Sequence, residues 1–484
     1  MSELWSAGRE GLIYSGGWLD SGSHVDVLEP ATGQLLGRAG VARAPDVARA
    51  SAAAAQAQRE WAATGFDERA AVFRRAAILL QDNSSEITQW IVRETGAVLG
   101  KAQFELQLTI RACWEAASAA SQPTGVVLPT TGKRLSFARR VPHGVVGVIS
   151  PFNFPLYLSM RTVAPALAAG NAVVLKPDLQ TPLTGGLLIA EIFERAGLPR
   201  GTLHVLPGGG DTGEALIEDP HIGMISFTGS TATGRVVATA AAKHLKKVSL
   251  ELGGKNSTIV LDDADLDVAA SNVAWAAYLH QGQICMSTGR VLVQRSILEA
   301  LTEKLVSKAK QLPVGDPARE EVALGPIISQ RQVDRIDRIV QETINQGAVL
   351  LAGGTHRGLF YDPTVLGDVR PGMRGFEDEV FGPVALITPF GADEESVALA
   401  NRTTYGLSAG IISSSVARAS AIGHQLRVGI LHINDQTVDD EGVNPFGGVG
   451  SSGNGARVGG PANAEEFTQW QWVTVQDKAS AYPF

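Results

Sequence analysis

The chain has 484 residues, of which 44% are hydrophobic and 19% charged, and its net charge is −8. This length predicts at least two domains with cores of their own, and the acidic balance argues against a nucleic-acid partner. The longest apolar stretches, such as residues 164–175, are interrupted and too short to span a membrane. Two cysteines cannot build a disulfide framework, so a reducing, cytoplasmic setting is expected, and the first residues do not resemble a signal peptide.

The first 141 residues combine short strands, helices and a hairpin. The first forty residues are typical of strands and turns, with one strand at 25–28. Residues 44–120 are alanine-rich with helical spacing, and the run Asn83-Ser84-Ser85-Glu86 predicts a helix N-cap. Strand-like runs at 125–128 and 135–141 flank a Thr-Gly turn and indicate a protruding hairpin.

From residue 145 to 254, short apolar runs alternate with helical stretches. The runs at 147–150, 172–176, 203–206 and 224–227 are each followed by a loop and a helical pattern. This rhythm predicts an α/β fold with a parallel, doubly wound sheet. A second alternation of the same kind follows residue 285, with strands expected at 290–293 and 384–387. In the tail, residues 471–475 again have a composition typical of a strand.

Cys285 and Glu251 form the most informative pair in the sequence. Cys285 follows a glycine-containing run, and Glu251 lies 34 residues earlier between two leucines. A thiol can attack an electrophilic carbon, and a carboxylate can activate the water that releases the product. Alone, Cys285 also fits a buried cysteine that packs as a small apolar residue, which is the role expected of Cys113. Glu251 alone fits a structural ion pair equally well.

Asn153 lies between two aromatic residues and two prolines, in the run Pro151-Phe152-Asn153-Phe154-Pro155. Its amide can donate to an oxyanion formed on Cys285. The alternative is a turn asparagine that bonds its own backbone.

Two glycine patterns compete for a dinucleotide. Residues 208–213 match the Gly-x-Gly-x-x-Gly spacing, but the acidic residue expected about 20 positions later is missing, so a simple turn is predicted. Residues 227–234 follow a strand and open a helix, where backbone N–H groups and Ser230 suit a pyrophosphate. Lys176 ends a parallel strand, and ligands bind at this end of the strands in such sheets. Without further evidence, a lysine exposed to solvent is the expected interpretation. Glu379, taken alone, fits a surface acid before a turn.

Seven motifs, in this order, resemble those of the aldehyde dehydrogenase superfamily and extend over nearly the whole chain. The interval between Glu251 and Cys285 also matches that family. The motifs are Pro151-Phe152-Asn153-Phe154-Pro155, Leu175-Lys176-Pro177, Phe227-Thr228-Gly229-Ser230-Thr231, Leu250-Glu251-Leu252-Gly253-Gly254-Lys255, Gly282-Gln283-Ile284-Cys285, Glu379-Val380-Phe381-Gly382-Pro383 and Asn444-Pro445-Phe446-Gly447-Gly448.

The resemblance implies a role for each matched residue. Cys285 would be the nucleophile, Glu251 the base for deacylation, and Asn153 with the Cys285 N–H the oxyanion hole. Lys176 would bind the adenosine ribose, and Glu379 would hold the nicotinamide ribose. The full set implied for NAD, with NADP also accepted, is Ser150, Phe152, Lys176, Gly229, Ser230, Gly234, Leu252, Glu379 and Phe381; no metal is implied.

The resemblance also implies the domain organisation. A cofactor domain would comprise residues 1–120 and 142–253, and a catalytic domain residues 254–452. Residues 121–141 and 453–484 would form an oligomerisation arm and tail, in which the hairpin pairs with the tail strand. A homodimer or homotetramer is then expected, because such strands have unpaired edges.

Two positions depart from the family pattern. Many members that prefer NAD carry a glutamate three residues after the lysine, where this chain has Leu179, preceded by Asp178. The loss of that glutamate would permit NADP, and Asp178 would partly oppose it. The family's Gly-Arg-Glu run near the C-terminus is replaced by residues 453–457, which puts any role of its glutamate in doubt.

The tail and the Lys176-Pro177-Asp178 run are similar to the benzaldehyde and vanillin dehydrogenase branch of the family. An aromatic aldehyde is therefore expected, and an apolar pocket suits a flat ring. The alternatives are an aliphatic aldehyde or semialdehyde, a CoA-acylating enzyme, a cysteine hydrolase using His280, and a non-catalytic binding or structural protein. The pocket residues implied by motif matching are Phe154, Tyr157, Leu158, Tyr278, Ile284, Met286 and Phe446.

Overall fold

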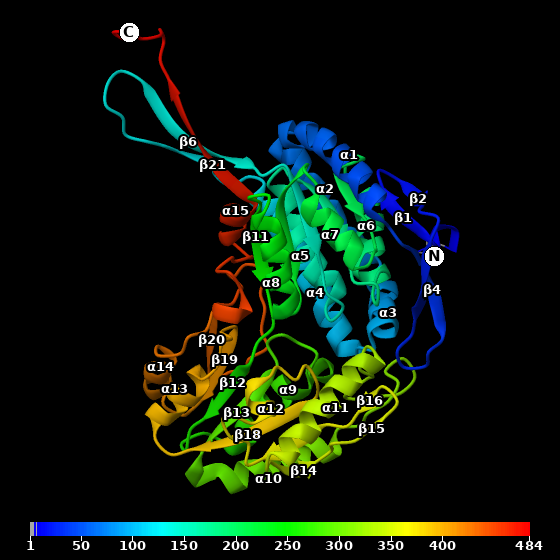
Figure 1. Cartoon of the computed structure of the whole chain (residues 1–484), viewed down its shortest axis with the longest axis vertical. Helices are drawn as coiled ribbons and strands as arrows, with labels where there is room; N and C mark the ends of the chain where they lie inside the picture. The colour runs from blue at the N-terminus through cyan, green and yellow to red at the C-terminus, as the bar shows by residue number, and fades with distance from the viewer. Residues whose placement is uncertain (1–3, 6) are drawn as a thin grey trace.

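A computed structural model describes residues 4–5 and 7–484, which form two α/β lobes and a projecting arm (Figure 1). The first lobe is built on a seven-stranded sheet in the order β11-β10-β7-β8-β9-β1-β2. Strands β7 to β11 run parallel, and β1 and β2 add an antiparallel edge. The bounds are β1 Leu12–Ser15, β2 Trp18–Asp20, β7 Val145–Ile149, β8 Ala172–Lys176, β9 Leu203–Val205, β10 Ile222–Thr228 and β11 Lys247–Glu251.

Helices cover both faces of this first sheet, so its strands carry apolar residues on both sides. Val173 and Val174 show the alternation: Val174 packs with α1, α7 and α8, and Val173 with the cluster of α2 to α6. The bounds are α1 Ala44–Ala63, α2 Phe66–Asp82, α3 Ser84–Thr95, α4 Leu99–Ala119, α5 Pro155–Ala168, η2 Leu183–Leu187, α6 Leu188–Arg195, α7 Gly210–Glu218 and α8 Thr231–Ala242.

The second lobe is built on another seven-stranded sheet, in the order β14-β17-β18-β13-β12-β19-β20. All neighbouring pairs are parallel except β14 and β17. Its strands are β12 Asn256–Val260, β13 Thr288–Gln294, β14 Val349–Ala352, β17 Thr364–Gly367, β18 Val384–Phe390, β19 Ser408–Ile412 and β20 Ile430–Ile433. Its helices are α9 Leu266–Tyr278, α10 Leu298–Gln311, α11 Gln330–Asn345, α12 Arg374–Glu377, α13 Asp393–Asn401 and α14 Val416–Gly423.

The arm is a three-stranded antiparallel sheet in the order β21-β6-β5, and it carries the C-terminus away from both lobes (Figure 1). Eight residues of the tail strand pair with the hairpin, from Thr468 opposite Pro142 to Val475 opposite Leu135, as the sequence predicts. The bounds are β5 Gly125–Val127, β6 Leu135–Pro142, α15 Ala462–Phe467 and β21 Thr468–Val475. The remaining short elements are η1 Ala7–Arg9, β3 His24–Leu28, β4 Leu35–Gly40, η3 Leu279–Gly282, η4 Arg295–Ile297, β15 His356–Arg357, β16 Phe360–Tyr361 and η5 Gly450–Ser452.

The predicted α/β class with two parallel sheets is confirmed. The predicted boundary at residues 253 and 254 falls in the loop between β11 and β12, which joins the two sheets. Before the tail reaches the arm, it returns to the first lobe, where Gly453 pairs with Glu251 and α15 packs on α5. In the described residues, no helix is both long and apolar enough to cross a membrane.

The predicted cap at Asn83 is wrong in its chemistry, although α3 does begin at Ser84. Because α2 ends at Asp82, Asn83 belongs to both helix ends, and its side chain donates to the Leu79 carbonyl at 2.7 Å instead of capping α3. Glu86 is likewise occupied, since it accepts the backbone N–H groups of residues 4 and 5.

Candidate active site

The predicted chemistry gathers where the two sheets face each other. Glu251 is the last residue of β11, at the carboxyl end of the first parallel sheet, and Cys285 comes just before β13 of the second sheet. A cavity of about 450 Å³ lies between them. The predicted residues that line it are Phe152, Asn153, Leu158, Gly229, Ser230, Glu251, Leu252, Cys285, Glu379, Phe381 and Phe446.

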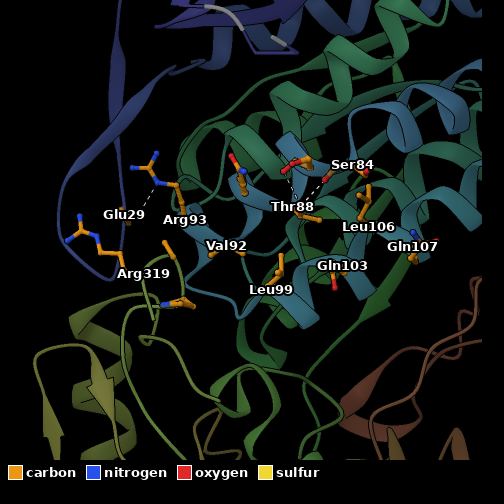
Figure 2. Close-up of a pocket in the computed structure, with 14 residues that line it drawn as sticks. Glu29, Ser84, Thr88, Val92, Arg93, Leu99, Gln103, Leu106, Gln107 and Arg319 are labelled. Carbon is orange, nitrogen blue, oxygen red and sulfur yellow. Dashed lines mark hydrogen bonds and ion pairs between the residues drawn. The ribbon is translucent and has the colours of Figure 1, made fainter. Parts of the chain in front are cut away.

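A larger cavity, of about 990 Å³, lies between α3, α4 and residues 317–319 (Figure 2). Among its polar side chains, Arg93 pairs with Glu29 at 2.8 Å, and Thr88 donates to the Ser84 carbonyl. None of the residues predicted for chemistry lines it. The smaller cavity brings together a thiol, an amide and two carboxylates, so we take it as the candidate active site.

Cys285 is half-buried, and its position is fixed by a hydrogen bond to its backbone carbonyl. The Asn256 amide donates to the Cys285 carbonyl at 2.8 Å and to the Ser287 carbonyl at 2.9 Å. Gly254 allows this close approach, because a Cβ there would come within 2.6 Å of the Cys285 carbonyl. Burial and the Glu379 carboxylate raise the pKa of the Cys285 thiol to about 12. The thiol therefore needs help from its surroundings to become a nucleophile.

The Glu251 carboxyl group has an environment that raises its affinity for a proton. It is buried, and among the described residues neither of its oxygens has a hydrogen-bond partner. Burial raises the pKa of Glu251 to about 8, while Arg161 and Arg457 oppose the shift. This value places the group in the range of a useful general base, which favours that role over a structural ion pair.

Asn153 bridges the two halves of the site. Its side-chain amide donates to the Gln283 carbonyl at 2.9 Å, two residues before Cys285. It is therefore not the self-bonded turn asparagine considered above. The amide has a second N–H, which leaves a donor beside the nucleophile.

Arg161 and Asp440 are site residues that the sequence reasoning missed. Arg161 lines the cavity from α5, and its Nη1 lies 3.0 Å from Asp440 Oδ2. Its guanidinium stacks 3.8 Å from the ring centre of Phe446, and in the part of the chain that the structure describes its buried Nη2 has no hydrogen-bond partner. The positive charge lowers the pKa of both Cys285 and Glu251. The available signal was an arginine within an otherwise apolar helix.

The start of α8 forms one wall of the cavity. Ser230 is the N-cap of this helix, its hydroxyl accepts from the Thr233 N–H, and Gly229 precedes it. Gly234 lies one turn into the helix, where a Cβ would meet Leu252 at 2.5 Å. The exposed N–H groups of a helix start and its positive dipole end attract a phosphate group.

Glu379 lines the same cavity as Cys285, from the second lobe. Its Oε1 accepts the Gly254 N–H at 3.1 Å, and burial raises its pKa. A Cβ on Gly253 would meet this carboxylate at 2.3 Å, so the glycine keeps the space beside it open. The rings of Phe381 and Phe152, which both line the cavity, meet edge to face with their centres 6.0 Å apart.

Lys176 and Ser150 lie outside the lining of this cavity. The Lys176 ammonium donates to the Pro177 carbonyl at 3.3 Å, at the carboxyl end of β8. Burial lowers the pKa of Lys176, and the carboxylates of Asp178 and Asp211 oppose the shift. The Ser150 hydroxyl accepts from Ser159 at 2.7 Å.

Five of the seven predicted pocket residues form one apolar cluster with Cys285, namely Phe154, Leu158, Ile284, Met286 and Phe446. Tyr157 lies in the core of the first lobe, where burial and Asp440 raise the pKa of its hydroxyl. Tyr278 lies in the core of the second lobe, with its hydroxyl donating to the Thr364 carbonyl at 3.2 Å.

His280 and the glycine run at 208–213 do not line the cavity that holds Cys285 and Glu251. The His280 ring interacts with the Asn153 backbone and the Gln281 side chain, and among the described residues it makes no hydrogen bond to Cys285. Its ring packs edge to face on Phe154, and burial holds its pKa well below the usual range. The glycine run leads into α7, where Thr212 bonds the Ala42 carbonyl at 2.7 Å.

Residues 18–473 match the model of the aldehyde dehydrogenase family. The chain is 53% identical over 484 residues to a vanillin dehydrogenase from Amycolatopsis sp., covering 100% of this chain and 99% of that protein. It is 50% identical over 476 residues to a benzaldehyde dehydrogenase (NAD+) from Pseudomonas putida, covering 98% of each.

Solved structures show the same fold. A betaine aldehyde dehydrogenase from Staphylococcus aureus in complex with NAD+ has a TM-score of 0.95 at 28% identity, covering 98% of this chain and 96% of that one. A salicylaldehyde dehydrogenase from Pseudomonas putida G7 complexed with salicylaldehyde has a TM-score of 0.94 at 34% identity, covering 98% and 99%.

Proposed function

Because the chain belongs to the aldehyde dehydrogenase family, we propose that it oxidises an aromatic aldehyde of the benzaldehyde or vanillin type to the acid. The observation that carries the proposal is the meeting of Cys285, Asn153 and Glu251 in one cavity beside an apolar cluster. A hydrolase would need a base for the thiol other than His280, which does not line the cavity, and a non-catalytic protein would not need these groups together.

The first step in this proposal belongs to Cys285. Its sulfur forms a bond to the aldehyde carbon, and the carbonyl oxygen becomes an oxyanion of a thiohemiacetal. The free N–H of the Asn153 amide and the Cys285 backbone N–H stabilise that oxygen. Arg161 favours the thiolate, because its charge lowers the pKa of Cys285.

The residues around the cavity fit NAD or NADP. The α8 start suits the pyrophosphate, and Glu379 stands beside the space that Gly253 keeps open for a ribose. When bound, the nicotinamide accepts the hydride that leaves the substrate carbon, which turns the adduct on Cys285 into a thioester. Glu251 then takes a proton from water, and the hydroxide adds to the thioester carbon. The carbon–sulfur bond breaks, the acid leaves, and the proton passes from Glu251 to the sulfur, which restores the thiol and the carboxylate.

The apolar cluster around Cys285 predicts a preference for benzaldehyde over hexanal. A planar ring can pack on Leu158 and Phe446, which line the cavity, with little loss of internal freedom, whereas a flexible chain must be ordered. We expect kcat/KM for benzaldehyde to exceed that for hexanal by about tenfold or more. Initial rates of reduced cofactor formation measure both; a higher value for hexanal would contradict the aromatic assignment and favour the aliphatic alternative.

Two carboxylates near Lys176 predict that NAD is the better cofactor. Asp178 and Asp211 both interact with the Lys176 ammonium, so a 2′-phosphate on the bound ribose would meet like charge. We expect the double change Asp178→Asn and Asp211→Asn to raise kcat/KM for NADP by about three- to tenfold, since screening weakens exposed charges. Glu218→Gln, at the far end of α7, is the control. An unchanged ratio of NADP to NAD efficiency would contradict the assignment.

The arm supports a homodimer or homotetramer. Trp472 is 66% exposed and Val127 is 78% exposed, and β21 is an edge strand of the arm sheet. Apolar side chains beside an open strand edge favour association with another copy. Cys285 acts only while reduced, which is consistent with a cytoplasmic location.

A further inference from the structure

Lys101 and Glu105 form a buried ion pair that no step described above uses. They lie one turn apart on α4, both side chains are fully buried, and Lys101 Nζ lies 2.5 Å from Glu105 Oε2. Removing two charges from water is costly unless their remaining hydrogen-bonding positions are filled. The partners that fill these positions are therefore informative.

The second carboxylate oxygen of Glu105 accepts hydrogen bonds from backbone N–H groups at the start of α5. This oxygen, Oε1, accepts the N–H of Leu156 at 2.9 Å and that of Tyr157 at 3.2 Å. The N-cap position of α5 is Phe154, which offers no side-chain cap of its own. A carboxylate from another helix thus caps α5 and also complements its positive dipole end.

The Lys101 ammonium makes a second hydrogen bond, to the backbone of a residue just before α5. It donates to the Asn153 backbone carbonyl at 2.7 Å and lies 4.0 Å from the centre of the Phe154 ring. Asn153 in turn donates its side-chain amide to the Gln283 carbonyl at 2.9 Å. A continuous series of contacts therefore runs from Lys101 through Asn153 to the loop that carries Cys285.

The loop before Cys285 also needs external support. His280 and Gln281 adopt left-handed backbone conformations, with φ of 49° and 57°, which residues other than glycine rarely adopt. Gln281 donates to the carbonyls of Gly96 and Pro326, both at 2.9 Å. Gly96 is the C-cap of α3, three residues before α4 begins, so Gln281 and Asn153 are both bonded to the α3–α4 part of the first lobe.

We propose that Lys101 and Glu105 are positioning residues for aldehyde oxidation, which hold Asn153 where its amide meets the oxyanion on Cys285. The proposal rests on the proposed function. A displacement of about 1 Å in such a donor costs up to about 100-fold in rate. We expect Lys101→Met to lower kcat by about 10- to 100-fold with KM changed by less than about threefold, and Lys101→Arg to restore part of the loss.

Two reactions of Cys285 distinguish a displaced Asn153 amide from a general disruption of the site. Cofactor-free hydrolysis of 4-nitrophenyl acetate passes through an oxyanion on the acylated thiol, whereas alkylation by iodoacetamide does not. Lys101→Met should slow the first about as much as it slows oxidation and leave the second within about twofold. Neither reaction uses NAD or an aromatic aldehyde, so both reactions test the positioning role independently of the substrate. A wild-type enzyme that is inactive with benzaldehyde would contradict the proposed function and leave this test of positioning intact.

A double-mutant cycle with Asn153→Ala identifies the residue through which Lys101 acts. If it acts through Asn153, Lys101→Met costs little more once the amide is absent. Glu94→Gln is the matched control, because Glu94 is equally buried and caps a helical segment through Leu183 and Thr184 at 2.9 and 2.8 Å. It should change thermal stability but not ester hydrolysis.

The combined change Lys101→Met and Glu105→Gln leaves no buried charge unpaired and replaces the single variant if that one does not fold. Three results would overturn the proposal: unchanged ester hydrolysis in these variants, an equal loss of ester hydrolysis and alkylation, or a full additional loss in the Asn153→Ala background.

Discussion

Replacing Cys285 by alanine is expected to abolish aldehyde oxidation, with a fall in kcat of at least about 10³-fold. The carbon–sulfur bond is the one covalent step that the protein itself supplies, and the residues around Cys285 are arranged for its products. In the proposed mechanism Asn153 would provide an oxyanion donor, and the charge of Arg161 favours the charged forms of Cys285 and Glu251. Without the sulfur, hydride transfer would have to start from an unactivated aldehyde.

The measurement is the formation of reduced nicotinamide with benzaldehyde, using NAD and NADP in turn. Cys113→Ala is the matched control, because Cys113 is fully buried in α4 and burial raises its pKa to about 12 without any acid–base partner. It should retain activity. Equal losses in both variants would assign the effect to folding, and substantial activity in Cys285→Ala would contradict the thiol mechanism.

The sequence predicts those parts of the site that are carried by short local runs. Glu251 ends a strand, Ser230 caps a helix and Cys285 precedes a strand, and each element forms where its own residues favour it. The parallel sheets follow for the same reason, since apolar runs between helical stretches have few other ways to bury both faces.

The parts that could not be predicted depend on contacts between distant segments. Arg161 and Asp440 are 279 positions apart, and only the fold brings their charges to 3.0 Å beside the nucleophile. Tyr278 illustrates the opposite case: it is near Cys285 in sequence, yet α9 carries it into the core of the second lobe. The cap expected at Asn83 fails because neighbouring helices and the N-terminal segment compete for the same polar groups.

Glu251→Gln is expected to separate the two halves of the reaction. Acylation of Cys285 does not need a base for water, so the variant should release about one equivalent of reduced cofactor per active site in a burst. The steady-state rate that follows should be about 10²- to 10⁴-fold below wild type, because the water that attacks the thioester has lost its base. Stopped-flow absorbance measures both phases, and a variant with no burst would place Glu251 in an earlier step.

The pH dependence of wild type gives an independent check on the same residue. A general base works as the carboxylate, and burial raises the pKa of Glu251 to about 8, so product release should accelerate as pH rises through about 8 and level off above it. In Glu251→Gln this rise should disappear from the slow phase, whereas in Glu94→Gln it should remain. If the variant kept the wild-type profile, the titrating group would be another one, and the elevated pKa of Glu251 would reflect burial without a part in catalysis.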